Sequence, residues 1–150
     1  MEILAAAIYL VSKQQDIPVF IEDLVVPLSI DKTRVLRAYK LICRALEIKV
    51  IPRGCAENYI IRICSDLGLN GAVPTVAIKA SKKKVTPNPT VLAAACVYLS
   101  ASILRKGIKQ REIARYARVS EPALRENFNK LLKRIDVMEL KNFADGIKTD

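Results

Sequence analysis

The stretch Lys109–Arg134, KQREIARYARVSEPALRENFNKLLKR, decides the fold of this chain, because it predicts two short helices joined by a tight turn. The first helix is expected over residues 110–117, with apolar residues at the spacing of a buried stripe. This stripe consists of Ile113, Ala114 and Ala117. Residues 118–119 are expected to form the turn.

The second helix is expected to begin after Ser120, whose hydroxyl can accept a hydrogen bond from an amide of the first turn. Glu121 places negative charge at the positive end of the helix dipole, and Pro122 is tolerated in a first turn. The residues expected to face inward are Leu124, Phe128, Leu131 and Leu132. Those expected to face outward are Arg125, Asn129, Lys130 and Lys133. This pattern predicts a helix-turn-helix, whose second helix lies in a DNA major groove.

A solvated helical hairpin is the alternative for such a helix pair, and charge distinguishes the two. Residues 105–134 hold ten Lys or Arg against three Glu, a net charge of +7, while the whole chain carries +10. Most of the excess positive charge therefore lies in this segment, as expected of a surface that faces phosphates.

The composition of the chain indicates a packed protein without catalytic machinery. Its 150 residues are enough for one domain or two small ones, and the 51% that are hydrophobic can supply a packed core. The chain has no His, and its four Cys include no CxxC pair, so neither a zinc site nor the commonest general base is expected. We expect a protein that is not an enzyme, with no cofactor and four reduced, buried cysteines.

The positive charge favours nucleic acid as the partner, with an anionic membrane surface second. The longest apolar runs, residues 3–11 and 91–99, are about half the length needed to span a bilayer. No basic region precedes the first run, so we expect an intracellular protein, in the archaeal cytoplasm and nucleoid or in a nucleus.

The sequence repeats itself at an offset of 89 residues. Core and capping positions coincide without a gap, so the two halves share a packing plan. The equivalent positions include Ala5 and Ala94, Tyr9 and Tyr98, Asp31 and Ser120, Val35 and Leu124, and Tyr39 and Phe128. The repeat predicts a first unit at 1–48, a linker at 49–55, a second unit at 56–137 and a short tail or frayed helix at 138–150.

In the first unit, helices are expected over residues 2–13, 21–26 and from the cap Asp31 to about 47. The outer face of the last helix carries Lys32, Arg34, Arg37, Lys40 and Arg44. These charges indicate a solvated face, or a surface for an acidic protein or a phosphate backbone. In the second unit, helices are expected over 56–67 and 75–84, followed by an alanine-rich helix with Asn88 as cap and Pro89 in its first turn.

Several of these stretches resemble the core domain of the family of archaeal transcription factor B and eukaryotic transcription factor IIB. The resembling motifs are ILAAAIYLVS (3–12), DKTRVLRAYKLICRAL (31–46), ENYIIRICSDLGL (57–69), PNPTVLAAACVYLSA (87–101) and KQREIARYARVSEPALRENFNKLLK (109–133). The resemblance implies an all-α fold of cyclin-like repeats, with a complete five-helix second repeat ending in the helix-turn-helix.

The resemblance also implies a transcription initiation factor that binds TATA-binding protein and promoter DNA, with RNA polymerase as a further candidate partner. The helix-turn-helix would read the element upstream of the TATA box through Pro122, Ala123 and Arg125, and Arg125 is suited by its chemistry to pair with guanine. Phosphate contacts are expected from Gln110, Arg111, Lys130 and Lys133. Arg118, Ser120 and Asn129 complete the candidate DNA surface, and the basic helix at 31–47 would face TATA-binding protein.

The chain departs from the family pattern in its first repeat, which has about three helices and lacks the first two. The zinc ribbon that engages the polymerase is also missing, Lys109 stands where the family usually has Thr, and Pro122 replaces a residue that is often β-branched. An alanine-rich helix without two neighbours exposes an apolar face. We therefore expect the first three helices to pack on another chain, as a homodimer or in the promoter complex, or the chain to be a fragment of a longer factor.

Two further functions stay open: a partial factor that modulates initiation without recruiting polymerase, and a cyclin-like protein-interaction module that does not bind DNA.

Overall fold

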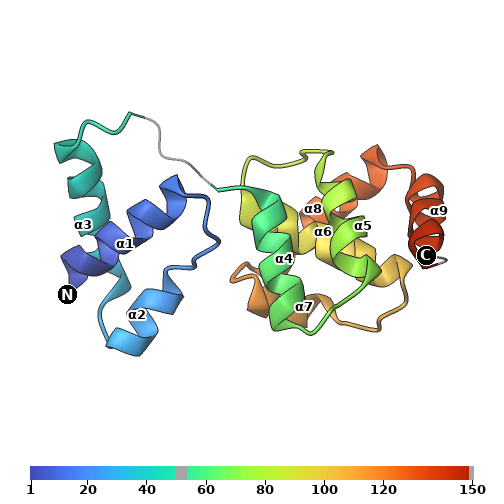
Figure 1. Ribbon diagram of the computed structural model, residues 1–150, viewed down its shortest axis with the longest axis horizontal. Coiled ribbons are helices and arrows are strands. Elements are labelled where there is room, and N and C mark those ends of the chain that lie inside the picture. The colour runs from blue at the N-terminus through green and yellow to red at the C-terminus, as the bar shows by residue number, and fades with distance from the viewer. Residues whose placement is uncertain (50–53, 149–150) are drawn as a thin grey trace. The chain divides into compact units, whose positions relative to one another are not determined.

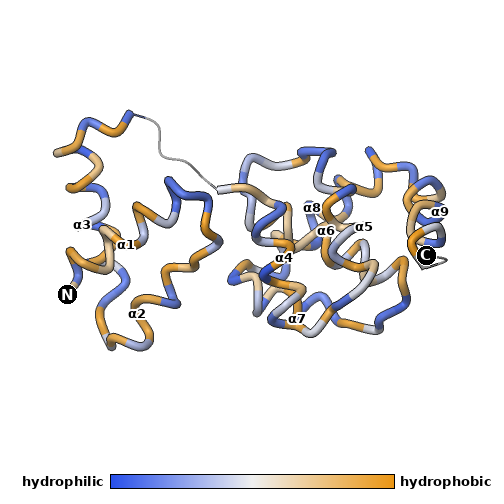
Figure 2. Tube along the Cα trace, in the orientation of Figure 1, coloured by the Kyte–Doolittle hydropathy of each residue, from blue (hydrophilic) through white to orange (hydrophobic). Residues whose placement is uncertain are grey.

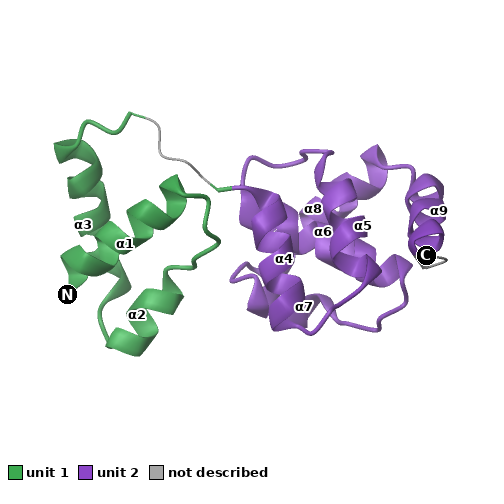
Figure 3. Cartoon of the chain, in the orientation of Figure 1, with its two compact units in different colours: residues 1–54 green, residues 55–150 purple. Residues whose placement is uncertain are grey.

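The structure is a computed structural model that describes residues 1–49 and 54–148, and all regular structure in these residues is helical (Figure 1). The all-α prediction is confirmed. The chain divides into two compact units, Met1–Gly54 and Cys55–Asp150 (Figure 3). The linker expected at 49–55 falls largely on residues 50–53, which lie outside the described residues.

Unit 1 consists of three helices, α1 (Glu2–Gln14), α2 (Glu22–Leu28) and α3 (Lys32–Ala45). Its core forms mainly where α1 packs against α3, and the rings of Tyr9 and Tyr39 meet edge to face with centroids 5.4 Å apart. The carboxylate of Asp31 caps α3 as predicted, because it accepts a hydrogen bond of 2.8 Å from the backbone N–H of Arg34. The helix expected to stop at Pro27 instead extends one residue beyond it, to Leu28, and the proline forfeits only the one hydrogen bond of its missing N–H.

Unit 2 contains six helices within its described residues. They are α4 (Ala56–Asp66), α5 (Ala72–Ser81), α6 (Pro89–Ile103), α7 (Gln110–Tyr116), α8 (Glu121–Arg134) and α9 (Val137–Lys148). The central helix is α6, which packs against α4, α5, α7 and α8. Because neighbours cover it on several sides, buried residues occur around its whole circumference, and hydrophobic residues run along its trace (Figure 2).

Local signals fix where α6 and α5 begin. The side-chain oxygen of Asn88 accepts hydrogen bonds from the backbone N–H groups of Thr90 and Val91, at 3.1 and 3.3 Å, and Pro89 lies in the first turn as predicted. Helix α5 begins at Ala72, three residues earlier than expected, because Gly71 makes the turn at φ 74° and Pro74 is accommodated in the first turn.

The segment 138–150, expected to be a short tail or a frayed helix, instead lies largely within the ordered helix α9. Asp136 accepts hydrogen bonds from the backbone N–H groups of Met138 and Glu139, at 2.9 and 3.1 Å, and so caps this helix. Leu140 and Ala144 are buried, and α9 packs against α5. The apolar residues Val137, Leu140, Ala144 and Ile147 recur at helical spacing, so the sequence carried a signal for α9 that the tail prediction overlooked.

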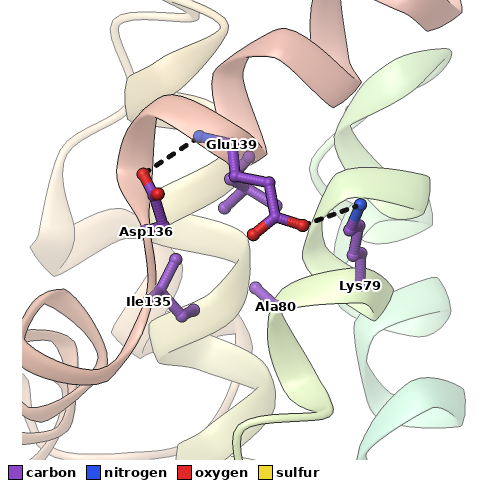
Figure 4. Close-up of a pocket in the computed structure, with 6 residues that line it drawn as sticks. Lys79, Ala80, Ile135, Asp136 and Glu139 are labelled. Carbon is purple, nitrogen blue, oxygen red and sulfur yellow. Dashed lines mark hydrogen bonds and ion pairs between the residues drawn. The ribbon is translucent and has the colours of Figure 1, made fainter.

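An ion pair joins α9 to α5 beside a small pocket of about 50 Å³ (Figure 4). The carboxylate of Glu139 lies 3.9 Å from the ammonium of Lys79, which also lies 4.0 Å from the centroid of the Phe143 ring. Both side chains of the ion pair are exposed, so it contributes little, and α9 is held mainly by its buried apolar residues.

Two kinds of feature are absent from the part of the chain that the structure describes. None of its helices combines the length and the hydrophobicity needed to cross a membrane. These residues also hold no group of three His, Cys, Asp or Glu side chains arranged to bind a metal ion.

Candidate nucleic-acid interface

Helices α7 and α8 form a packed pair at one side of α6. Their buried residues are Ile113 and Ala114 on α7 and Leu124 and Leu131 on α8, together with Ala117 in the connection. The two helices contact each other, and both contact α6. Because the apolar faces of both helices are covered in this way, their polar faces are left for solvent or a ligand.

The connection between α7 and α8 is a four-residue turn, residues 117–120, which contains a helix C-capping motif. Arg118 has a left-handed backbone conformation with φ 56°, and its N–H donates to the carbonyl of Arg115 at 3.3 Å. The next residue, Val119, donates to the carbonyl of Ala114 at 3.1 Å. These two bonds form a Schellman motif, which ends α7 and redirects the chain. The hydroxyl of Ser120 then accepts a 3.3 Å hydrogen bond from the N–H of Ala123, so Ser120 caps α8.

Arg125 is held between the two helices. Its Nε donates to Oε1 of Gln110 at 3.3 Å, and its Nη2 lies 3.3 Å from Oε1 of Glu121 one turn earlier on α8. The side chain nevertheless remains 58% exposed. The structure thus brings together Gln110 and Arg125, two of the candidate residues, and holds the guanidinium near the first turns of α8.

The other candidate residues mostly lie on the surface. The exposed ones are Arg111, Arg118, Ser120, Pro122, Asn129, Lys130 and Lys133, whereas Gln110 and Ala123 are partly buried. Lys130 lies 2.7 Å from the carboxylate of Glu126, and this hydrogen-bonded ion pair lowers the pKa of Glu126. Lys130 is therefore already paired in the free protein.

One inward position of α8 was predicted wrongly. Leu132 is 41% exposed, and Asn127 is buried in its place, with only 7% of its surface accessible. The phase of the helix is set by Leu124 and Leu131, and the position three residues after Leu124 turns inward with them. The Nδ2 of Asn127 donates to the carbonyl of Ala123 at 2.9 Å, which satisfies part of its side chain.

A polar pocket of about 220 Å³ lies at the end of α7, lined by Arg115, Tyr116 and Arg118. Of these three residues, the sequence pattern singled out only Arg118. The available signal was the pair of arginines three residues apart at a helix end, but without the turn geometry it does not show that they share a pocket.

On α3, the five candidate protein-binding residues divide into two groups. Lys32 lies 2.6 Å from the carboxylate of Glu22, and Arg34 lies 3.7 Å from that of Glu2. Arg37, Lys40 and Arg44 are exposed and make no ion pair with the described residues. Their spacing of three and four places them on one stripe of α3.

Comparison with known proteins places these features in a family. The model of the transcription factor TFIIB repeat matches residues 53–134, more than half of the chain. Over 141 residues, 90% of this chain, the sequence is 32% identical to a transcription initiation factor IIB of Archaeoglobus fulgidus and 31% identical to one of Methanocaldococcus jannaschii. It covers 43% and 21% of those two relatives, respectively, so it spans less than half their length. The matched residues include α4 to α8 and the whole helix-turn-helix, and the chain therefore belongs to the transcription factor TFIIB repeat family.

Proposed function

We propose that this chain acts as the core of a transcription initiation factor, in which α8 lies in the major groove of promoter DNA. The observation that carries the proposal is the packed helix pair α7–α8 together with the loop that precedes it, because this segment holds the larger part of the chain's excess positive charge. Residues 105–134 contribute +7 of the +10. Such a surface attracts the phosphate backbone, and the second helix of such a pair has the diameter to enter a major groove.

Base reading is assigned to Arg125, with Pro122 and Ala123 beside it, at the element upstream of the TATA box. A guanidinium can donate two parallel hydrogen bonds to O6 and N7 of guanine. Because Gln110 and Glu121 already restrain Arg125, less conformational freedom is lost when it pairs with a base. The side chains of Arg111 and Lys133 are assigned to phosphates, which fix the register of the protein without specifying sequence.

The second proposed partner is TATA-binding protein, which α3 would contact. The stripe of Arg37, Lys40 and Arg44 supports this assignment, since unpaired exposed charges on one helix favour an acidic partner. RNA polymerase is a further candidate partner of the assembled complex. A partial factor that modulates initiation without recruiting polymerase would use the same two surfaces.

A protein-interaction module that does not bind DNA is the second candidate function, and one observation favours it. The helix α1 leaves four large apolar residues exposed: Ile3, Leu4, Ile8 and Val11. A contiguous apolar face of this kind usually binds a partner. A homodimer through α1 is one form of this proposal, and sedimentation equilibrium of the chain alone tests it, because a monomer at micromolar concentration excludes it.

The experiment that tests DNA binding is a gel-shift assay with TATA-binding protein and a TATA-containing promoter fragment. We expect the chain to produce a supershift that depends on the segment upstream of the TATA box and weakens steeply with salt. A supershift that is the same without that segment would contradict base reading. No supershift at any salt concentration would favour the protein-interaction module.

Two matched variants separate base reading from phosphate binding. Arg125→Ala is expected to cost about 1 to 3 kcal/mol on the preferred sequence and little on a sequence mutated at one base pair. Arg111→Ala removes an equal charge but should weaken binding to all sequences uniformly and reduce the salt dependence. If both variants behave alike, Arg125 contacts phosphate rather than a base.

A further inference from the structure

The pocket at the end of α7 is not part of the base-reading surface and has its own chemistry. It encloses about 220 Å³ and is lined by Arg115, Tyr116 and Arg118. All three side chains are exposed to solvent. A hollow bordered by two guanidinium groups and a phenol offers donors and positive charge, which is a combination that suits an anion.

The backbone explains why the two arginines share this pocket. Arg115 lies in the last turn of α7, and Arg118 follows it in the left-handed position of the Schellman motif. Glycine is the residue that usually occupies this position, because it adopts a positive φ without steric cost. Here the position instead carries a long cationic side chain, beside another at the helix end.

The charges of the pocket are not neutralised by ion pairs within the described part of the chain. Neither Arg115 nor Arg118 makes an ion pair with any residue that the structure describes, whereas Arg125 and Lys130 on α8 are each paired with a glutamate. Two unpaired guanidinium groups that border one pocket repel each other, and a bound anion relieves this repulsion. Phosphate and carboxylate groups both match this pocket, because the planar fork of arginine binds two oxygens of either group at once.

We infer that Arg115, Tyr116 and Arg118 form a binding site for a backbone phosphate of duplex DNA. The inference rests on the proposed function and adds a second point of attachment, outside the groove-facing side of α8. DNA is favoured over other phosphate-bearing partners because the pocket belongs to the turn that leads directly into the capped first turn of α8. A phosphate held here fixes the position of that turn on the backbone while α8 reads bases.

The test measures the affinity for a duplex of arbitrary sequence as a function of salt concentration. The double variant Arg115→Gln with Arg118→Gln is compared with the wild type and with a control, Lys83→Gln with Lys84→Gln. The control removes the same charge from two exposed lysines between α5 and α6. Loss of one phosphate contact should reduce the slope of log K against log salt by about 0.9, equivalent to about eightfold weaker binding at 0.1 M salt. The control should leave the slope unchanged.

A third variant separates binding from folding. Arg118→Gly removes the guanidinium but places the favoured residue at the left-handed position, so the protein should be at least as stable as the wild type while binding DNA more weakly. Tyr116→Phe is expected to weaken binding by a smaller factor, because it removes only the hydroxyl donor.

The outcomes distinguish this inference from the proposed function. A wild-type protein without salt-dependent DNA binding would overturn both. Steep salt dependence in the wild type, retained in the double variant or lost equally in the lysine control, would overturn only the phosphate site. Loss of binding to an acidic polypeptide such as polyglutamate, with DNA binding intact, would also overturn it and assign the pocket to a protein partner.

Discussion

The helices α1 and α6 occupy equivalent places in the internal repeat, but their environments differ. On one shared side, Ala5 and Ala6 are buried in α1, as Ala94 and Ala95 are in α6. On the other side the two helices diverge. Ile3, Leu4, Ile8 and Val11 are 70%, 55%, 43% and 52% exposed, whereas their equivalents Leu92, Ala93, Val97 and Ser100 are 4% exposed or less.

The difference between α1 and α6 lies in their neighbours rather than in their sequences. In unit 2, α4 and α5 pack against α6, and the hydroxyl of Ser100 donates to the carbonyl of Val73 on α5 at 2.7 Å. Within unit 1, α1 packs against α2 and α3. A helix that is apolar on all sides is suited to burial on all sides, and of the two helices only α6 is buried in this way. The comparison therefore identifies the exposed face of α1 as the surface that corresponds to a packed interface in unit 2.

The largest expected effect comes from placing a charge at equivalent positions of the two helices. Val97→Asp buries an unpaired carboxylate and should destabilise unit 2 by about 4 kcal/mol or more. Ile8→Asp, at the equivalent position of α1, should destabilise unit 1 by only about 1 to 2 kcal/mol, because 43% of Ile8 is exposed and a carboxylate there can reach water.

Cysteine alkylation during urea unfolding, read by mass spectrometry, can follow each unit separately. Cys43 is buried in unit 1, and Cys64 and Cys96 are buried in unit 2. Burial raises the pKa of the Cys64 and Cys96 thiols to about 12, so at pH 8 they should react only when unit 2 opens. A large loss of protection at Cys43 in Ile8→Asp would contradict the comparison, since it would mean that the α1 face is covered in solution.

The sequence was sufficient to predict what depends on local signals. The caps Asp31, Asn88 and Ser120 lie where they were expected, because a short polar side chain before an apolar run satisfies orphan amides in one way. The helix pair α7–α8 followed from its apolar spacing. Asn127 could not be predicted as buried, because a polar side chain is normally expected on the surface. Its inward position is set by the neighbouring buried residues Leu124 and Leu131. The pocket at Arg115 depends on a left-handed residue, and the sequence offers no glycine to mark it.

The second expected effect concerns α9, which packs against α5 in unit 2 and whose residues were expected to form a short tail or a frayed helix. Leu140→Ala should destabilise unit 2 by about 2 to 4 kcal/mol, because Leu140 is buried where α9 meets α5. Met138→Ala, on the same helix but 63% exposed, is the matched control and should cost about 0.5 kcal/mol or less. If both variants leave the protection of Cys64 and Cys96 unchanged, α9 does not contribute to the stability of this unit.

The third expected effect uses the aromatic pair that the repeat places in both units. Tyr39 packs on Tyr9 in unit 1, and its equivalent Phe128 packs on Tyr98 in unit 2, with ring centroids 4.8 Å apart. Burial, with smaller contributions from neighbouring Cys43 and Tyr9, raises the pKa of Tyr39 to about 12. Because this pKa is higher in the folded state, the neutral phenol stabilises unit 1 fully below pH 10, and that stability is lost as pH rises through 12.

The difference between wild type and Tyr39→Phe isolates this effect from other groups that titrate at high pH. Between pH 10 and 12 the wild type should lose about 1 to 2 kcal/mol more than Tyr39→Phe. Amide signals of unit 1 in two-dimensional NMR spectra report the loss, with those of unit 2 as the internal reference. Identical pH profiles for the two proteins would place the hydroxyl of Tyr39 in contact with water.

The smallest expected effect compares the equivalent caps Asp31 and Ser120. Asp31→Ala should cost about 1 kcal/mol or slightly more, and Ser120→Ala slightly less. The hydrogen bond of Asp31 is shorter, at 2.8 Å against 3.3 Å, and its carboxylate also interacts with the helix dipole.

Ser120→Asp should therefore stabilise α8 by a few tenths of a kcal/mol, measured by urea unfolding. It should nevertheless weaken DNA binding, because it adds negative charge at the end of α8 that is proposed to approach phosphates. If Ser120→Asp instead binds DNA as tightly as the wild type, the first turn of α8 does not lie near the DNA backbone. The neutral charge of the Ser120 cap would then not be required for DNA binding.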